Sequence, residues 1–233
     1  MKKLIYILFL TAFYGASCFS QSSSGTFKTT VQNTITYNYL LHKPETKTQK
    51  PLIIFLHGSG ERGSDIEKIK VHGPFKYLKN NTLEAFVLAP QCPENTYWES
   101  ESLYQLIQKI CKENTNIDTN RIYLTGLSMG AWGAWNLVFA HPEMFAAFVP
   151  IAGFVDRVPM VENCKIKHIP TYIFHGLLDD VVTVNYAIEI YKKLKPCSLN
   201  IELTIFDDAN HDSWSRVYDD SKIYEWMFQQ IKK

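Results

Sequence analysis

The chain of 233 residues is 46% hydrophobic and carries 24 Lys and Arg against 23 Asp and Glu. This length and apolar content suffice for one sizeable core, so we expect a single folded domain. Because the charges nearly balance and are scattered along the chain, nothing in the composition indicates nucleic acid or a membrane surface as a partner.

The N-terminus has the pattern of a secretory signal peptide. Lys2 and Lys3 precede an apolar run over residues 4–13 and small residues at 15–17. The apolar run is about half of the roughly 20 residues that a membrane-spanning helix requires. We therefore predict a signal peptide over residues 1–20 and a secreted or periplasmic protein with no membrane span. The folded domain then covers residues 21–233.

Cys18 offers an alternative to cleavage after Ser20. Residues 15–18 resemble a bacterial lipobox, which would make the protein a lipoprotein attached at Cys18. An aliphatic residue is expected where Gly15 stands, so the secreted form is the preferred interpretation.

Four cysteines lie beyond this segment, namely Cys92, Cys111, Cys164 and Cys197. In an exported protein an even number permits two disulfides, with three possible connectivities. Four buried free thiols are the alternative. The wide and irregular spacing of the cysteines excludes a CxxC metal or redox motif.

The chain then alternates between strand and helix patterns. Residues 26–41 alternate in polarity in two runs, which predicts an opening antiparallel hairpin. Residues 51–56 are continuously apolar, as is typical of a central strand buried on both faces. Further strands are expected over residues 85–90, 121–126, 148–152, 171–174 and 201–206, and helices over 102–111, 129–141, 184–194 and 221–231.

This order predicts an α/β fold with a mostly parallel central sheet and helices on both faces. Residues 153–170 are too few for a large lid domain, so we expect the site to lie open at the carboxyl ends of the strands.

Gly126-Leu127-Ser128-Met129-Gly130 fits the G-x-S-x-G pattern between a predicted strand and a predicted helix. In this motif the serine stands on a sharp strand-to-helix turn, and the glycines avoid a collision of Cβ atoms where the two elements meet. Ser128 is therefore a candidate nucleophile.

A serine hydroxyl is a weak nucleophile that needs a neighbouring base, and the base needs an orienting carboxylate. His211 follows the last predicted strand in a loop from which it can reach back to Ser128. Asp179 and Asp180 follow the strand over residues 171–174. One of these two carboxylates is expected to accept a hydrogen bond from His211.

Negative charge that develops on a reacting carbonyl needs two backbone N–H donors. The residue after the nucleophile, Met129, supplies one. Ser59, in the glycine-containing loop over residues 57–60 that follows the first central strand, is predicted to supply the other. His57 is expected to brace this loop.

Side chains on the loops at the same edge are candidates for substrate binding. We predict that Trp98 and Trp214 form an exposed sugar or aryl platform. Glu61 and Arg62 are expected to form an ion pair that shapes their loop, with a clamp on a polar substrate group as the alternative. Two tryptophans on the helix after Ser128 are expected in the core, Trp132 and Trp135.

Five motifs in this order resemble the secreted "predicted peptidase/phospholipase" group of α/β-hydrolases, over residues 56–63, 89–93, 121–130, 174–179 and 210–214. That group is similar to carboxylesterases, acyl-protein thioesterases and feruloyl or acetylxylan esterases. The resemblance runs from about residue 28 to the C-terminus. It implies an α/β-hydrolase catalytic domain with Ser128, Asp179 and His211 as the catalytic triad.

The resemblance implies a secreted serine esterase that uses no metal or cofactor. Its expected substrates are small-molecule or polysaccharide-linked esters, including acyl or feruloyl esters of plant polysaccharide. Two alternatives stay open, a serine peptidase of the prolyl-oligopeptidase type and a non-catalytic hydrolase-fold binding protein. A binding protein is expected to have lost a member of the triad, and here all three are present.

Overall fold

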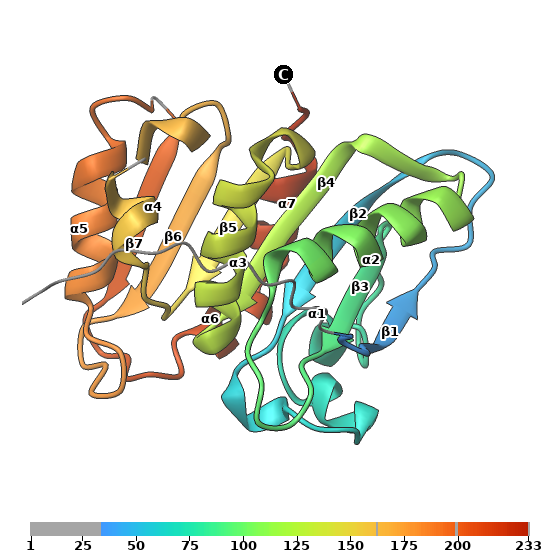
Figure 1. The fold of residues 1–233 in the computed structure, drawn as a ribbon, viewed down its shortest axis with the longest axis horizontal. Coiled ribbons are helices and arrows are strands. Elements are labelled where there is room, and N and C mark those ends of the chain that lie inside the picture. The colour runs from blue at the N-terminus through green and yellow to red at the C-terminus, as the bar shows by residue number, and fades with distance from the viewer. Residues whose placement is uncertain (1–33, 162, 199, 233) are drawn as a thin grey trace, which may run out of the picture. The chain divides into compact units, whose positions relative to one another are not determined.

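The structure, a computed structural model, describes residues 34–161, 163–198 and 200–232 (Figure 1). The chain from Ile35 onward forms one compact unit. The predicted signal peptide over residues 1–20 and the alternative lipid site at Cys18 lie outside the described residues. So does the first run of the predicted hairpin.

In the described part of the chain, seven strands form one sheet in the order β1-β3-β2-β4-β5-β6-β7. The strands are β1 (Asn38–His42), β2 (Lys50–Leu56), β3 (Phe86–Gln91), β4 (Ile117–Leu127), β5 (Ala147–Ile151), β6 (Thr171–Gly176) and β7 (Ile201–Phe206). β1 runs antiparallel to β3, and all other neighbours are parallel. The mostly parallel sheet is confirmed. The second run of the predicted hairpin is β1, whose partner among the described residues is β3.

The apolar run of β2 is buried on both faces, as its sequence predicts. Residues 52–56 have no exposed surface. Because successive side chains of a strand point to opposite faces, Leu52 and Ile54 pack into one core while Ile53 and Phe55 pack into another. A sheet covered on both sides therefore requires a continuous apolar strand rather than an alternating one.

Helices cover both faces of the sheet (Figure 1). On the face of Ile54 lie α2 (Ser100–Glu113), α3 (Met129–Ala140) and α5 (Asn185–Leu194). On the face of Phe55 lie α1 (Gly73–Tyr77), α6 (Trp214–Tyr218) and α7 (Ser221–Phe228). Shorter elements are α4 (Arg157–Val161) and the 3-10 helices η1 (Ser59–Glu61), η2 (Ile66–Val71), η3 (Pro142–Met144) and η4 (Asn163–Ile166). Among the described residues, no helix has the length and apolar character needed to cross a membrane.

The connection from β5 to β6 holds α4 and η4 in the residues that are described. This agrees with the prediction that no large lid domain is inserted there. The edge formed by the carboxyl ends of the parallel strands is therefore not enclosed by an inserted domain at this point.

The four cysteines of the described residues form one disulfide, between Cys164 in η4 and Cys197 after α5. Cys92 is buried and Cys111 is half-buried, and both are free thiols. The result lies between the two alternatives that the sequence leaves open, because one pair is bridged and the other two cysteines pack as apolar side chains.

Candidate active site

Ser128 stands between β4 and α3 in a strained backbone conformation. Its φ of 52° and ψ of −120° lie in a region that non-glycine residues rarely adopt, at a cost of about 1–3 kcal/mol. A Cβ at Gly126 would collide with the backbone of Gly130, and a Cβ at Gly130 would collide with the carbonyl oxygen of Leu56. The two glycines therefore let α3 pack directly on the ends of β4 and β2, and this packing fixes the turn that carries Ser128.

Asp179 lies in the turn after β6, and its side chain has no exposed surface. Its Oδ1 accepts hydrogen bonds from the N–H groups of Val181 and Val182, at 3.0 and 2.8 Å. Burial opposes ionisation, but hydrogen bonds from His211 and from these two N–H groups outweigh it and hold the pKa of Asp179 below its usual value. Asp180 is exposed. Of the two candidate carboxylates, Asp179 is the one that contacts His211.

His211 lies in the loop between β7 and α6 and joins Asp179 to Ser128. Its Nδ1 is 2.8 Å from Asp179 Oδ2, and its Nε2 is 2.9 Å from Ser128 Oγ. An ionised carboxylate can only accept hydrogen bonds, so Nδ1 carries the proton and donates to Asp179. Nε2 is then free to accept the hydrogen bond of the Ser128 hydroxyl. The geometry suits transfer of that proton to His211.

The two predicted oxyanion donors border one cavity with Ser128. Ser59 is the first residue of η1 and Met129 is the first residue of α3. The N–H group of a first helical residue has no acceptor within its own helix. Backbone donors from two helix N-termini are therefore available beside the serine.

His57 braces the loop that carries Ser59, as the sequence predicts. The backbone N–H of Cys92 donates to His57 Nε2 at 2.9 Å, so the ring proton lies on Nδ1, which donates to the carbonyl oxygen of Gly58 at 2.6 Å. Burial lowers the pKa of His57 to about 4, an effect that the hydrogen bond to Gly58 partly offsets. His57 is therefore neutral. It stabilises the loop and does not serve in proton transfer.

Trp98 and Trp214 do not form an exposed platform, because both are buried. Trp98 is 5% exposed and donates from Nε1 to the carbonyl oxygen of His57 at 3.2 Å. Trp214 is 9% exposed and packs edge-on against His211, with ring centroids 5.0 Å apart. The prediction that these two residues form an exposed platform for substrate is wrong. Each supports a loop that carries a residue of the site.

Three other aromatic residues line the cavity beside Ser128. The cavity has a volume of about 490 Å³ and is lined by Ser59, Arg62, Tyr97, Ser128, Met129, Trp132 and Phe154. Tyr97 packs edge-on against Trp132 and Trp132 stacks on Phe154, with centroids 5.6 and 5.7 Å apart. Trp135 lies in the core as predicted, whereas Trp132 is partly buried, packs against the core and also lines the cavity. Tyr97 and Phe154 were not predicted from the sequence, although both lie on loops at the predicted edge.

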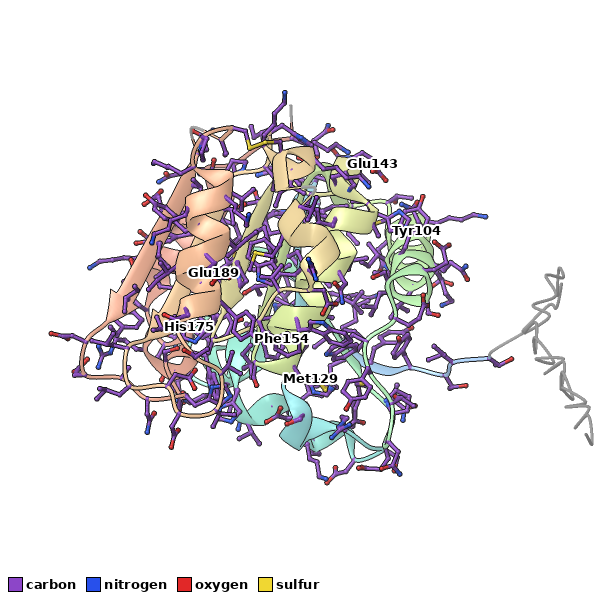
Figure 2. The ribbon with its side chains drawn as sticks, turned by 60° about the vertical axis from the view of Figure 1, so that its left-hand side comes forward. Tyr104, Met129, Glu143, Phe154, His175 and Glu189 are labelled. Carbon is purple, nitrogen blue, oxygen red and sulfur yellow. A yellow bond between two sulfur atoms is a disulfide. The ribbon has the colours of Figure 1, made fainter. Side chains whose placement is uncertain are left out.

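Phe154 also borders a second cavity of about 640 Å³. In Figure 2, Phe154 lies between Met129, which borders the first cavity, and Glu189, which borders the second. The second lining contains Asp156, Arg157, Tyr186, Glu189 and Lys193. Its charged groups distinguish it from the mainly aromatic and aliphatic wall beside Ser128.

Arg62 shapes its loop through backbone carbonyls. Its Nε donates to the carbonyl oxygen of Ser59 and its Nη1 to that of Thr96, each at 3.2 Å. Glu61 lies 3.8 Å from His57 Nδ1. The predicted Glu61–Arg62 ion pair is absent from the ion pairs between described residues. Arg62 instead borders the cavity at Ser128.

Three features together define an α/β-hydrolase. They are a mostly parallel sheet with helices on both faces, a serine on a strained strand-to-helix turn, and a histidine between that serine and a carboxylate. The family model described as phospholipase/carboxylesterase matches residues 88–224. The chain belongs to this family, and it is a hydrolase of the carboxylesterase and phospholipase kind.

Known proteins with similar sequences or structures include esterases. Mouse lysophospholipase-like protein 1 is 27% identical over 192 residues, which are 69% of this chain and 79% of that protein. The bifunctional acetylxylan esterase/xylanase XynS20E of Neocallimastix patriciarum is 34% identical over 94 residues, or 40% of this chain and 12% of that protein.

The crystal structure of a thermostable esterase is 32% identical and superposes with a TM-score of 0.72. The superposition covers 83% of this chain but 59% of that one, so this chain spans about three fifths of the esterase's length. The similarity supports the fold over most of the present chain.

Burial of His57 should make the fold less stable in acid. Its pKa is about 4 in the folded state and 6.5 in an unfolded chain, so between these values the unfolded state binds more protons. Stability that is present above pH 6.5 is therefore lost as the pH falls toward 4, by up to about 3 kcal/mol. Urea denaturation between pH 8 and pH 4.5 measures this loss.

His57→Gln should unfold with a smaller pH dependence over the same range. Its stability at pH 8, where His57 is neutral in both states, separates the loss of the brace from the effect of protonation. An identical decrease with pH in both proteins would show that His57 does not cause the acid sensitivity.

Proposed function

We propose that this chain is a secreted serine hydrolase that cleaves carboxylic esters through an acyl-enzyme on Ser128. The observation that carries the proposal is the pair of hydrogen bonds that links Ser128 to His211 and His211 to Asp179. This arrangement activates a serine hydroxyl, and the Asp179 carboxylate stabilises the imidazolium that forms.

In the proposed reaction, Ser128 Oγ attacks the ester carbonyl carbon while its proton passes to His211 Nε2. The N–H groups of Ser59 and Met129 stabilise the oxyanion. The C–O bond to the alcohol then breaks, and His211 returns the proton to the leaving oxygen. Water, deprotonated by His211, releases the acid and regenerates Ser128. Every proton is carried by His211, so the chemistry proposed here calls for no cofactor.

The residues that line the cavity beside Ser128 favour a substrate whose acyl group is apolar or aromatic. Its wall is formed by the rings of Tyr97, Trp132 and Phe154 together with Met129. Aromatic rings stack on a planar acyl group and add about 0.5–1.5 kcal/mol per pair beyond the burial of area. An aryl acyl group such as a feruloyl group fits this lining.

The residues that line the second cavity favour a substrate whose alcohol component is polar, such as a sugar of a plant polysaccharide. It begins at Phe154 and carries carboxylate side chains at Asp156 and Glu189 that can accept hydrogen bonds from hydroxyl groups. One relative is an acetylxylan esterase/xylanase. We therefore propose acyl or feruloyl esters of plant polysaccharide as substrates.

Secretion is part of the proposal and rests on the N-terminal sequence. The disulfide between Cys164 and Cys197 supports it, because such bonds persist mainly in oxidising compartments. Size determination of the mature protein by mass spectrometry, after export from a bacterial host, tests cleavage after Ser20. A mass increased by lipid at Cys18 would favour the lipoprotein alternative.

Ser128→Ala should lower kcat for p-nitrophenyl acetate by about 10⁶-fold, because the nucleophile is lost. Incubation of the wild-type protein with a fluorophosphonate probe should modify Ser128, which peptide mass spectrometry identifies. Full activity of Ser128→Ala would exclude an acyl-enzyme on this residue.

Asp179→Asn should lower kcat by about 10⁴-fold, because the amide favours the wrong tautomer of His211. The adjacent Asp180→Asn is the matched control and should keep kcat within about threefold, since the Asp180 side chain is exposed and is not among the partners of Ser128, Asp179 and His211 in the described part of the chain. Equal losses in the two variants would contradict the assignment of Asp179.

Tyr97→Ala should lower kcat/KM for methyl ferulate by about 2- to 10-fold, because one ring of the cavity wall is lost. The value for p-nitrophenyl acetate should change little, since an acetyl group is too small to stack on Tyr97. Leu178→Ala is the control, because Leu178 is 60% exposed and lies outside the cavity lining.

The same panel should include acetylated xylan and peptide anilides. Equal effects of Tyr97→Ala on acetyl and feruloyl esters would contradict the aryl site. Faster turnover of peptide anilides than of any ester would favour the peptidase alternative.

A further inference from the structure

His175 is a buried imidazole that the proposed reaction leaves without a task. It is the fifth residue of β6, and its relative exposure is 0%. It comes from the strand that presents Asp179, and Figure 2 labels it at the end of that strand. A side chain that only filled this space would be expected to be apolar, because an imidazole must satisfy two nitrogen atoms.

The contacts of His175 define where its proton lies. Nε2 is 2.8 Å from the carbonyl oxygen of Val182, which can only accept, so Nε2 carries the proton. Nδ1 is buried and has no hydrogen-bond partner among the described residues. Burial lowers the pKa of His175, and the charges that act on it are those of Asp179 and His211. The ring is therefore neutral, with one N–H donor that points toward the turn.

The Nε2–H group of His175 contacts both the carboxylate of Asp179 and the turn that follows it. His175 Nε2 lies 3.1 Å from Asp179 Oδ2, the same oxygen that accepts from His211 Nδ1. The carbonyl oxygen to which it donates belongs to Val182, whose own N–H donates to Asp179 Oδ1. The ring of His175 therefore links the two ends of the turn over residues 179–182. Rotation of the carboxylate away from His211 would break its contacts with His175 Nε2 and with the N–H of Val182.

We propose that His175 is a positioning residue, whose Nε2–H fixes Asp179 and its turn so that Oδ2 meets His211 Nδ1. The proposal rests on the proposed ester hydrolysis at Ser128. His175 does not line the cavity beside Ser128, so its effect must reach the substrate through Asp179 and His211. The orphan Nδ1 is consistent with this role, because the position tolerates an unsatisfied nitrogen in order to place the other one.

Three substitutions separate positioning from the filling of space. The amide of Gln reaches the place of Nε2, the amide of Asn reaches only the place of Nδ1, and Leu fills the space without a donor. His175→Leu and His175→Asn should lower kcat for p-nitrophenyl acetate by about 10- to 100-fold, because Asp179 is displaced. KM should stay within about twofold, and His175→Gln should keep kcat within about threefold of wild type.

Labelling of Ser128 by a fluorophosphonate probe is the second readout. A wild-type protein that is neither labelled nor active would overturn the proposed function. If wild type is labelled, slow labelling of the Leu and Asn variants with rescue by Gln supports the positioning role. Wild-type rates in the Leu variant would overturn that role alone. If the Leu variant does not fold, the Gln and Asn variants decide, and equal kcat values in these two amides would overturn the proposal.

Discussion

The carboxylate of Asp179 is the constraint on which the site depends, because a buried charge is stable only when hydrogen bonds replace its lost water. The structure supplies two backbone N–H groups, His211 and the longer contact from His175. Each donor has a consequence. The backbone pair requires a tight turn after β6, and the bond to His211 determines which ring nitrogen faces Ser128. The orientation of His211 toward Ser128 therefore depends on Asp179, which forms its hydrogen bond with His211 and not with Ser128.

A second constraint is the close approach of α3 to β2. The strained turn at Ser128 persists because α3 packs where Gly130 leaves no room for a side chain against Leu56. The same end of β2 leads into the loop of Ser59, which hydrogen bonds of His57 and Trp98 hold in place. The proposed nucleophile and the proposed oxyanion donors are thus held by one packed junction at the ends of β2 and β4.

The fold and the three linked side chains could be predicted from the sequence because both have local signals. Continuous apolar runs define buried parallel strands, and the ends of such strands share one edge, which places Ser128, Asp179 and His211 together. The direction of a loop side chain has no such signal. Trp98 was expected to be exposed and is buried, while its neighbour Tyr97 is 63% exposed. The α3 helix is apolar around most of its surface, so periodicity could not separate Trp132 from Trp135.

Tyr97 is exposed and Trp98 is buried, so these two neighbours have different roles in the proposed enzyme. Trp98 donates to the loop that carries Ser59, whereas the ring of Tyr97 lines the cavity and lies 5.7 Å from the guanidinium of Arg62. Trp132 makes two different contacts. Its ring lines the cavity, while its Nε1 donates to Asp156 Oδ2 at 2.8 Å. A change at Tyr97 therefore alters the cavity wall and leaves the hydrogen bond from Trp98 to the loop of Ser59 in place. A change at Trp98 would remove that hydrogen bond and leave the cavity lining in place. Two residues that are adjacent in the chain therefore make different contacts, one with the proposed substrate surface and the other with the loop that carries Ser59.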